Sequence, residues 1–371
     1  MGFLNILKAG FSYIKSCLFK RKELSLEDFY INRFGKVLYN MFFENYTEKV
    51  WGVHPSKISA DWGAQRVKGI SITAVIKDFI NKKLGKKDKN NTETSLIESF
   101  LYPKLGSGQM WSEMADKIIN MGGTIKLKCN LVKVNIKNNR VYSIEYKENG
   151  KTYCLEIDYC VSSMPIKDLF LSLGGIKIDE GIYKASVNLP YREFMSVCMV
   201  VDKIILQNNT KVKTLNNIIP DSWIYIQEPE VRMGRLQIFN NWSPYLFKNK
   251  EDIKNKVLIG IEYFCSEDDK YWNMSDNDFI NFAIEEAIKI NLIENKNNVK
   301  KAIRIKIPKA YPAYFGSYAN IKDIIEYLNE YENLYCIGRN GQHRYNNMDH
   351  SMLTGIKAAE SIISGVGKEE V

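Results

Sequence analysis

Two turns rich in asparagine divide Thr124–Ile157 into three segments, and this pattern constrains the fold more than any other in the sequence. Asn138–Asn139 and Asn149–Gly150 each have the length and residue types of a two-residue β-hairpin turn. Apolar residues alternate along the first segment but change phase within it, so we expect a β-bulge near Asn130. The stretch predicts a three-stranded meander, and a fourth strand is expected over Tyr159–Ser163.

The chain from Leu334 onward predicts a strand, a polar loop and a helix. Leu334–Gly338 is a short apolar run that we expect to join a mixed sheet with the 124–163 strands, and Arg339–Asn347 is polar. A helix is expected from about Asp349, with Gly365 as its C-cap. The free N–H groups at such a helix start suit an electron-rich ligand such as the edge of a reduced flavin, although many units of this kind hold no ligand.

Most other elements are predicted from the spacing of apolar residues alone. A separate antiparallel sheet is expected within residues 185–310, from the candidate strands Ser196–Val201, Trp223–Gln227, Arg232–Phe239, Lys256–Cys265 and Lys301–Ile307. Helical spacing predicts helices over Leu26–Trp51, Ser71–Leu84, Trp111–Asn120, Ser275–Leu292 and Ile321–Tyr331. Lys82–Thr94 is rich in Lys and Asn and is expected to be a loop.

Composition limits the classes of protein that this chain can belong to. Its 371 residues suffice for two domains, or for one nucleotide-binding domain interrupted by a substrate domain. With 45% hydrophobic and 26% charged residues it is expected to be soluble and globular. The net charge of +9 favours anionic small-molecule partners. No basic stripe is interleaved with aromatic residues, so we expect no nucleic-acid partner.

Cysteine and histidine usage gives no sign of disulfides or metal. The seven cysteines form no CxxC and lie mostly in apolar runs, so they are expected to be reduced and buried, as in a cytoplasmic protein. The three histidines lack ligand spacing, and no metal site is expected. Met1–Phe19 is apolar but is interrupted by Lys8 and Lys15 and has no small-residue cleavage site. We favour an amphipathic helix packed on its own domain over membrane attachment, and no 18-residue apolar run predicts a transmembrane segment.

Three segments carry a resemblance to a known superfamily. Ile337–Ser351, which reads IGRNGQHRYNNMDHS, resembles the C-terminal FAD motif of the UDP-galactopyranose mutase, protoporphyrinogen oxidase and amine oxidase superfamily. Asn45–Arg66, which reads NYTEKVWGVHPSKISADWGAQR, is similar to the YTxKxWG…P…R signature of mutase-like proteins. Pro103–Met114 resembles a glycine-containing loop before a helix in the same families. The three occur in the family's order and together span most of the chain.

The resemblance implies a mixed α/β (α+β) fold with two parts. One is an incomplete FAD/NAD(P)-binding Rossmann-like domain with a β-meander, and the other is a substrate domain with an antiparallel sheet and helices. The expected division is a helical substrate-side region over 1–115, the FAD-domain meander and strand over 116–170, the antiparallel-sheet substrate domain over 171–312, and the C-terminal FAD-binding strand, loop and helix over 313–371.

The resemblance also assigns roles to individual residues. Those expected to bind the FAD cofactor are Val132 beside the adenosine half, Gly338 and Arg339 beside the isoalloxazine, and Asn347, Met348 and Asp349 at the helix start. Those expected to bind substrate are Trp51, Arg66, Tyr311, Tyr314 and Tyr345. The catalytic candidates are Arg339, Tyr345 and His343. Two alternatives stay open in which these residues have purely structural roles: Trp51 can simply anchor a helix end, and Arg66 can pair with Asp61.

Two kinds of departure distinguish this chain from a true mutase. His343 stands where the mutases carry a second substrate tyrosine, Asn347 where they carry an acidic residue, and Ile70 where a second arginine is expected. The sequence also contains no GxGxxG turn, whose glycines admit the FAD pyrophosphate. We therefore expect the chain to begin about one βαβ unit late, with the missing unit on a partner polypeptide or lost from a truncated gene.

Three functions remain open at this point. The first is an FAD-dependent oxidoreductase that acts on a sugar-nucleotide or surface-polysaccharide precursor. The second is an isomerase of the UDP-galactopyranose mutase type. The third is a non-catalytic remnant or subunit that needs a separate polypeptide bearing the GxGxxG turn.

Overall fold

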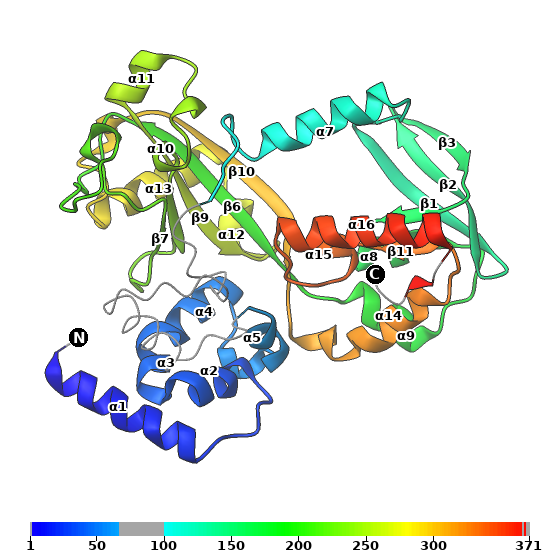
Figure 1. The fold of residues 1–371 in the computed structure, drawn as a ribbon, viewed down its shortest axis with the longest axis horizontal. Coiled ribbons are helices and arrows are strands. Elements are labelled where there is room, and N and C mark those ends of the chain that lie inside the picture. Colours follow the sequence, from blue (N-terminus) through cyan, green and yellow to red (C-terminus); the bar gives the residue numbers. More distant parts are fainter. Residues whose placement is uncertain (1, 67–99, 366, 369–371) are drawn as a thin grey trace. The chain divides into compact units, whose positions relative to one another are not determined.

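A computed structural model describes residues 2–66, 100–365, 367 and 368 (Figure 1). The chain divides into two units, each built from two separate stretches. Unit 1 comprises Met1–Gly122 and Glu193–Ile307, and unit 2 comprises Gly123–Arg192 and Pro308–Val371. The predicted helix Ser71–Leu84 and the predicted loop Lys82–Thr94 lie outside the described residues.

The N-terminal part of unit 1 is a group of short helices. They are α1 (Phe3–Leu18), α2 (Leu26–Phe34), α3 (Lys36–Phe42), α4 (Glu44–Trp51) and α5 (Ala60–Arg66). The prediction of one helix over Leu26–Trp51 is therefore wrong. Gly35 has a φ of +78°, a left-handed value that no α-helix contains, and Phe43 marks a second break. Each break turns the chain, so the aromatic residues of α2–α4 can bury against one another.

The rest of unit 1 is built around a five-stranded sheet, as predicted. Its order is β10 (Val299–Pro312), β6 (Tyr191–Val201), β9 (Val257–Cys265), β8 (Arg235–Ile238) and β7 (Trp223–Tyr225), and β6–β9, β9–β8 and β8–β7 pair antiparallel. Helix α13 (Asp276–Lys289) starts at Ser275, whose Oγ accepts from Asp278 N, and buries Phe279, Ala283 and Ala287 in the sheet's core. The other α-helices among the described residues of unit 1 are α7 (Gly108–Asn120), α10 (Phe239–Trp242), α11 (Lys250–Asn255) and α12 (Lys270–Asn273).

The predicted meander forms the larger sheet of unit 2. Strands β1 (Cys129–Lys137), β2 (Arg140–Glu148) and β3 (Lys151–Glu156) are joined by the two expected two-residue turns, and Asn138, Asn139, Asn149 and Gly150 all have positive φ. The register shifts between Leu131 and Lys133, which confirms a bulge close to the predicted place. The first strand begins at Cys129 rather than Thr124. The short β5 (Leu173–Gly174) adds to β1 in parallel.

A second, smaller sheet in unit 2 pairs β4 (Cys160–Ser162) with β11 (Leu334–Cys336) in parallel. The pairing of the last strand with Tyr159–Ser163 is confirmed, but the prediction of one mixed sheet with the meander is wrong. The side chain of the fully buried Asn333 supplies the reason. Its Nδ2 donates to Val141 O at 2.7 Å and its Oδ1 accepts from Val141 N at 2.9 Å, so a side chain occupies the backbone groups that a neighbouring strand would use.

Helices complete the core of unit 2. They are α8 (Ile166–Ser172), α9 (Glu180–Val187), α14 (Ile321–Asn329), α15 (Gly338–Gly341) and α16 (Met348–Ser364). The buried side chains of α8 and α14 form one apolar cluster with those of β1, β2 and β11. Gly365 ends α16 in the left-handed conformation, as predicted.

Three further properties follow from the described residues. All seven cysteines are free thiols. Only Cys265 is fully buried, while Cys17 and Cys154 are exposed, so the prediction that the cysteines are buried holds only in part.

No helix in the described ranges is both long and apolar enough to cross a membrane. Within the same ranges, no group of three or more His, Cys, Asp or Glu side chains could hold a metal ion.

Candidate functional site

The loop that leaves β11 is shaped by two glycines. Gly338 has a φ of +72°, which glycine adopts without strain, and its N–H donates to Thr354 Oγ1 on α16 at 2.8 Å. A Cβ on Gly341 would lie 2.7 Å from the carbonyl oxygen of Ser162 on β4. Both positions therefore need glycine so that the short helix α15 can fold back against the two-stranded sheet. This turn sets the position of Arg339.

Arg339 is held by the backbone on two sides. Its Nε donates to the Asn346 carbonyl at 2.8 Å, and its Nη1 donates to the Ala310 carbonyl at 3.1 Å. Nη2 makes no hydrogen bond with any described residue. The guanidinium is thus a fixed, half-buried cation that keeps donors for an anionic group.

Two stacked tyrosine rings lie beside this guanidinium. The rings of Tyr311 and Tyr345 stack with their centroids 5.3 Å apart and their planes 16° apart. Arg339 Cζ lies 5.2 Å from the Tyr311 centroid and 5.1 Å from that of Tyr345. Three of the residues predicted to act on substrate thus lie together, and we call them the arginine–tyrosine cluster. It combines a cation with flat rings, which suits a ligand with both phosphate and ring parts.

Tyr314 and His343 are buried next to this cluster. Tyr314 is 1% exposed, and its Oη accepts from the backbone N–H of Tyr345 at 2.9 Å. His343 is fully buried; its Nε2 donates to the Ala313 carbonyl, and its ring packs edge-on against Tyr191. Burial lowers the pKa of His343 to about 4, so the ring is neutral at pH 7. Because both side chains are buried, they can hold the cluster in place. The predicted roles of Tyr314 in substrate binding and of His343 in catalysis stay predictions.

The residues predicted to meet the flavin edge lie at the start of α16. Asn347 is the N-cap, Met348 begins the helix, and Asp349 lies in its first turn, as predicted. All three are exposed, and the side chain of Asn347 makes no capping hydrogen bond to the first turn of the helix. A cavity shared by Asp349 and Arg339 stays a prediction. Val132 lies elsewhere in unit 2, at the β1 bulge, and is partly exposed.

The other two predicted substrate residues belong to unit 1. Trp51 ends α4, is 2% exposed and packs edge-to-face on Trp62 with ring centroids 5.8 Å apart. This geometry favours the alternative in which Trp51 anchors a helix end. Arg66 is the last residue of α5, and Asp61 lies in the first turn of the same helix.

The sequence did not predict one ion pair near the cluster. Lys309 Nζ lies 2.6 and 2.8 Å from the two carboxylate oxygens of Asp168 on α8. The carbonyl of Lys309 also accepts from Asn340 Nδ2 on α15, at 3.1 Å. These contacts tie β10 to the loop that carries Arg339. Asp168 and Lys309 are far apart in the chain, and no motif or spacing in the sequence connects them.

Comparison with known proteins identifies the fold. No protein-family model matches the chain. A crystal structure of reduced UDP-galactopyranose mutase superposes with a TM-score of 0.76 and 19% identity, over 100% of this chain and 75% of that one. The chain has the mutase fold. A protein from Exiguobacterium assigned as a protoporphyrinogen oxidase matches with a TM-score of 0.61 and 13% identity, over 97% of this chain and 73% of that one.

A third solved structure extends the comparison. An oxidoreductase from Methanosarcina mazei matches with a TM-score of 0.56 and 10% identity, over 97% of this chain and 73% of its own. These structures include two of the three groups of proteins named from the sequence motifs, the UDP-galactopyranose mutases and the protoporphyrinogen oxidases. The predicted mixed α/β fold class and the resemblance are therefore confirmed at the level of the mutase fold.

Proposed function

We propose that this chain belongs to an FAD-dependent oxidoreductase of the cytosol that acts on an anionic sugar nucleotide or a related surface-polysaccharide precursor. The observation that carries the proposal is the arginine–tyrosine cluster. Arg339 is fixed by two backbone carbonyls and keeps Nη2 for a phosphate oxygen. Tyr311 and Tyr345 offer ring faces to a sugar or a base. A planar guanidinium recognises phosphate with two parallel hydrogen bonds, which gives direction as well as affinity.

The residues of unit 2 fit the flavin half of FAD. The uncapped start of α16 offers N–H groups and a partial positive charge, and Asn347, Met348 and Asp349 are exposed there. Gly338 follows β11 by two residues and was predicted to lie beside the isoalloxazine, and a Cβ there would meet only Ser351, at 4.0 Å. When bound, FAD would supply hydride or N5 chemistry, while the cluster would bind and orient the substrate.

The phosphate half of FAD needs a further element. The sequence contains no GxGxxG turn, and among the described residues β4 and β11 pair only with each other. Parallel sheets are normally larger and covered on both faces. We propose that a βαβ segment carrying the glycine turn, supplied by a partner polypeptide, adds to this sheet and binds the pyrophosphate.

Two other functions compete with this proposal. A mutase-type isomerisation would use the same cluster, and the departures at Ile70, His343 and Asn347 argue against it. A non-catalytic remnant is favoured by the missing glycine turn. Both enzymatic functions require that the chain bind flavin once the βαβ segment is present. A non-catalytic remnant does not require it.

A flavin titration followed by absorbance tests the proposal. The chain alone is expected to bind FAD weakly or not at all, since two or three lost hydrogen bonds of about 1.5–3 kcal/mol each correspond to several factors of ten. Addition of a βαβ polypeptide that bears GxGxxG is expected to restore binding. Stoichiometric yellow protein from the chain alone would show that the turn is not needed. No binding with the segment present would favour the remnant.

A second measurement addresses the substrate class. In the complex with FAD, Arg339→Ala is expected to weaken binding of a UDP-hexose by about ten- to a hundredfold, the equivalent of about 1.5–3 kcal/mol. Arg140→Ala is the matched control, because Arg140 also lies over a tyrosine ring of unit 2 but at the start of β2. If both variants weaken binding equally, the arginine–tyrosine cluster is not part of the substrate site.

A further inference from the structure

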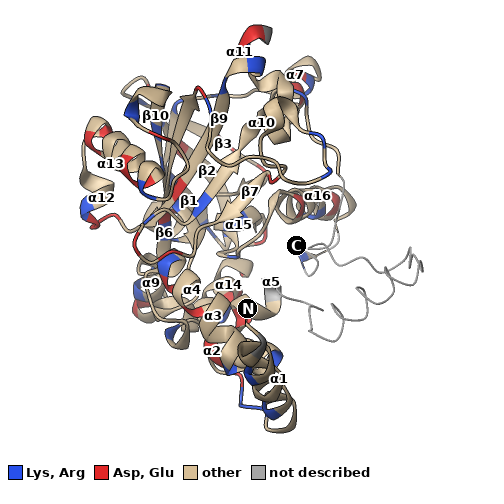
Figure 2. Cartoon of the chain, turned by 90° about the vertical axis from the view of Figure 1, so that its left-hand side faces the viewer, with Lys and Arg blue, Asp and Glu red and all other residues tan. Residues whose placement is uncertain are grey.

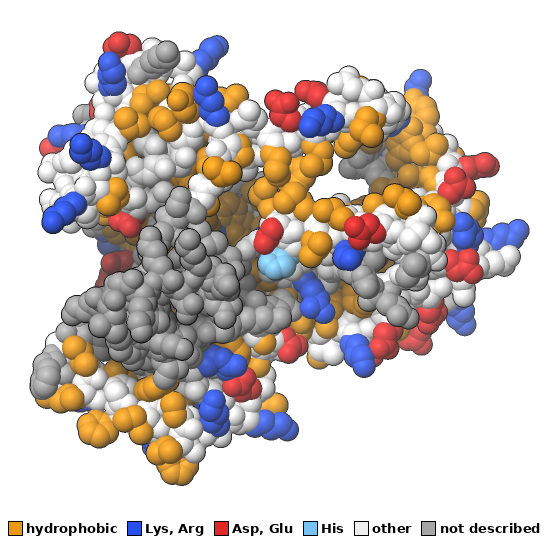
Figure 3. Space-filling model, viewed as in Figure 1, with side chains coloured by type: hydrophobic (Ala, Val, Ile, Leu, Met, Phe, Trp, Pro, Cys, Tyr) orange, Lys and Arg blue, Asp and Glu red, His pale blue; other side chains and the backbone are white. Residues whose placement is uncertain are grey.

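Helix α1 turns its largest apolar side chains away from the unit that holds it. Leu4, Leu7, Phe11, Ile14 and Leu18 recur at intervals of three and four residues and therefore share one side of the helix. All five are exposed, and Phe11 is 74% exposed. Figure 3 shows hydrophobic side chains along the outer surface of the region where Figure 1 draws α1. We call these five residues the α1 stripe.

The opposite side of α1 is the one that packs. Ala9 and Ser16 are buried there, and Ser12 Oγ accepts from the N–H of Val37 on α3 at 3.2 Å. A Cβ on Gly35 would lie 2.8 Å from Tyr13 N, so the helix backbone rests directly on this glycine. The helix thus packs on its own unit, as predicted, but through small residues. Close backbone packing fixes its rotation, so the α1 stripe faces outward.

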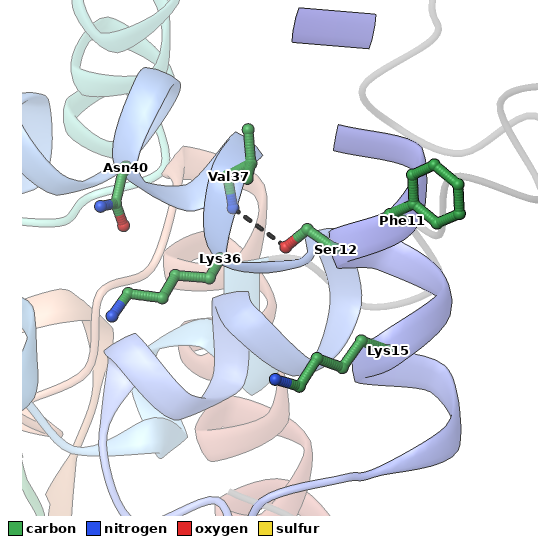
Figure 4. A pocket seen from close by; sticks show the side chains of 6 residues that line it. All are labelled: Phe11, Ser12, Lys15, Lys36, Val37 and Asn40. Carbon is green, nitrogen blue, oxygen red and sulfur yellow. Dashed lines mark hydrogen bonds between the residues drawn. The ribbon is translucent and has the colours of Figure 1, made fainter. Parts of the chain in front are cut away.

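Positive charge surrounds the α1 stripe. Residues 1–22 contain five cations, Lys8, Lys15, Lys20, Arg21 and Lys22, and no Asp or Glu. Lys8 and Lys15 lie beside the stripe on the helix surface, and Figure 2 shows basic residues along α1. Lys15 and Lys36 line a pocket of about 490 Å³ between α1 and α3, together with Phe11, Ser12, Val37 and Asn40 (Figure 4).

We propose that α1 binds the surface of a membrane that contains anionic lipids. An interfacial helix needs an apolar face of Leu and Phe beside a basic polar face, and both features are present here. In this arrangement the α1 stripe enters the boundary between headgroups and acyl chains. Lys8, Lys20 and Lys22 approach lipid phosphates, and the pocket that contains Lys15 and Lys36 offers two cations to one headgroup. Neither a second copy of this basic helix nor a basic partner would complement the charge.

Co-sedimentation of the full chain with vesicles tests this proposal. The chain is expected to bind vesicles of equal parts phosphatidylcholine and phosphatidylglycerol, to bind phosphatidylcholine alone at least tenfold more weakly, and to be released by 1 M salt. Phe11→Ser combined with Leu18→Ser is expected to weaken binding by a factor of ten or more, because two large apolar side chains no longer enter the membrane. Lys8→Glu combined with Lys22→Glu is expected to abolish the preference for anionic lipid.

Matched controls separate this effect from general changes in the protein. Leu127→Ser combined with Val212→Ser removes two exposed apolar residues that lie outside α1 and is expected to leave binding unchanged. Circular dichroism is expected to be the same for all variants, since every substituted side chain is exposed. Absence of binding to anionic vesicles, or equal binding by the Phe11/Leu18 double variant, would overturn the proposal. So would a wild-type dimer that this variant converts to a monomer, because the α1 stripe would then bind a second copy.

Discussion

The Nε2 atom of His343 lies 3.1 Å from the carbonyl oxygen of Ala313, inside a part of unit 2 that excludes water from the ring. A neutral imidazole can donate this hydrogen bond from Nε2, but a protonated ring would bury an additional charge. Burial accordingly lowers the pKa of His343 from 6.5 to about 4. The stability of the arginine–tyrosine cluster is thereby linked to pH.

The first prediction concerns this linkage. Between pH 6.5 and 4 the unfolded chain binds a proton at His343 that the folded chain does not, so the free energy of unfolding falls as the pH falls. The loss from this group is expected to reach about 2 kcal/mol at pH 5 and about 3 kcal/mol at pH 4. Urea unfolding of the wild type and of His343→Gln at pH 7, 5 and 4 measures it.

The difference in unfolding free energy between wild type and His343→Gln should shrink as the pH falls, because only the wild type carries the buried imidazole. A difference that stays constant over this range would mean that His343 is not the group responsible.

The second prediction concerns the support of Tyr345. In Tyr314→Phe the N–H of Tyr345 loses its acceptor within a half-buried loop, which is expected to cost about 1–3 kcal/mol of stability. Hydrogen exchange at the Tyr345 amide should accelerate more than at other amides of the loop. Tyr153→Phe, on the exposed face of β3, is expected to change neither quantity. An unchanged exchange rate at Tyr345 would indicate that its hydrogen bond to Tyr314 does not hold the loop.

The third prediction concerns the close approach of α15 to β4. Gly341→Ala places a Cβ 2.7 Å from the backbone oxygen of Ser162, which cannot move aside as the end of a flexible side chain could. We therefore expect the free energy of unfolding to fall by about 1–3 kcal/mol. Gly108→Ala, where no atom lies within 4 Å of the added Cβ, is expected to be neutral or slightly stabilising. Thermal or urea unfolding compares the two. Equal stability of both variants would contradict the packing described here.

Local signals in the sequence predicted local structure well. The meander was predicted correctly from Asn138–Asn139 and Asn149–Gly150, because few other residues adopt the positive φ of a two-residue turn. Gly365 gave the end of α16 for the same reason. Gly35 carries an equally local signal, and the expected helix over Leu26–Trp51 was broken at that residue.

Depth within the fold could not be predicted in the same way. Tyr311 and Tyr314 belong to one short segment, yet the first is half-buried beside Arg339 and the second is fully enclosed. The Asn333 side chain likewise bonds to Val141 across 192 positions of sequence, at the place where the two sheets of unit 2 separate. Such contacts depend on how distant segments pack, which no spacing along the chain records.

The pairing of β4 with β11 has a consequence for biosynthesis. About 170 residues separate the two strands, so a ribosome that adds about 5–20 residues per second needs on the order of 10–30 s to deliver the second strand after the first. Throughout that interval β4 has no β11 to pair with, and the loop that carries Arg339 does not yet exist. Unit 2 is therefore the later of the two units to be completed on the ribosome, and until then β4 presents an unpaired strand edge.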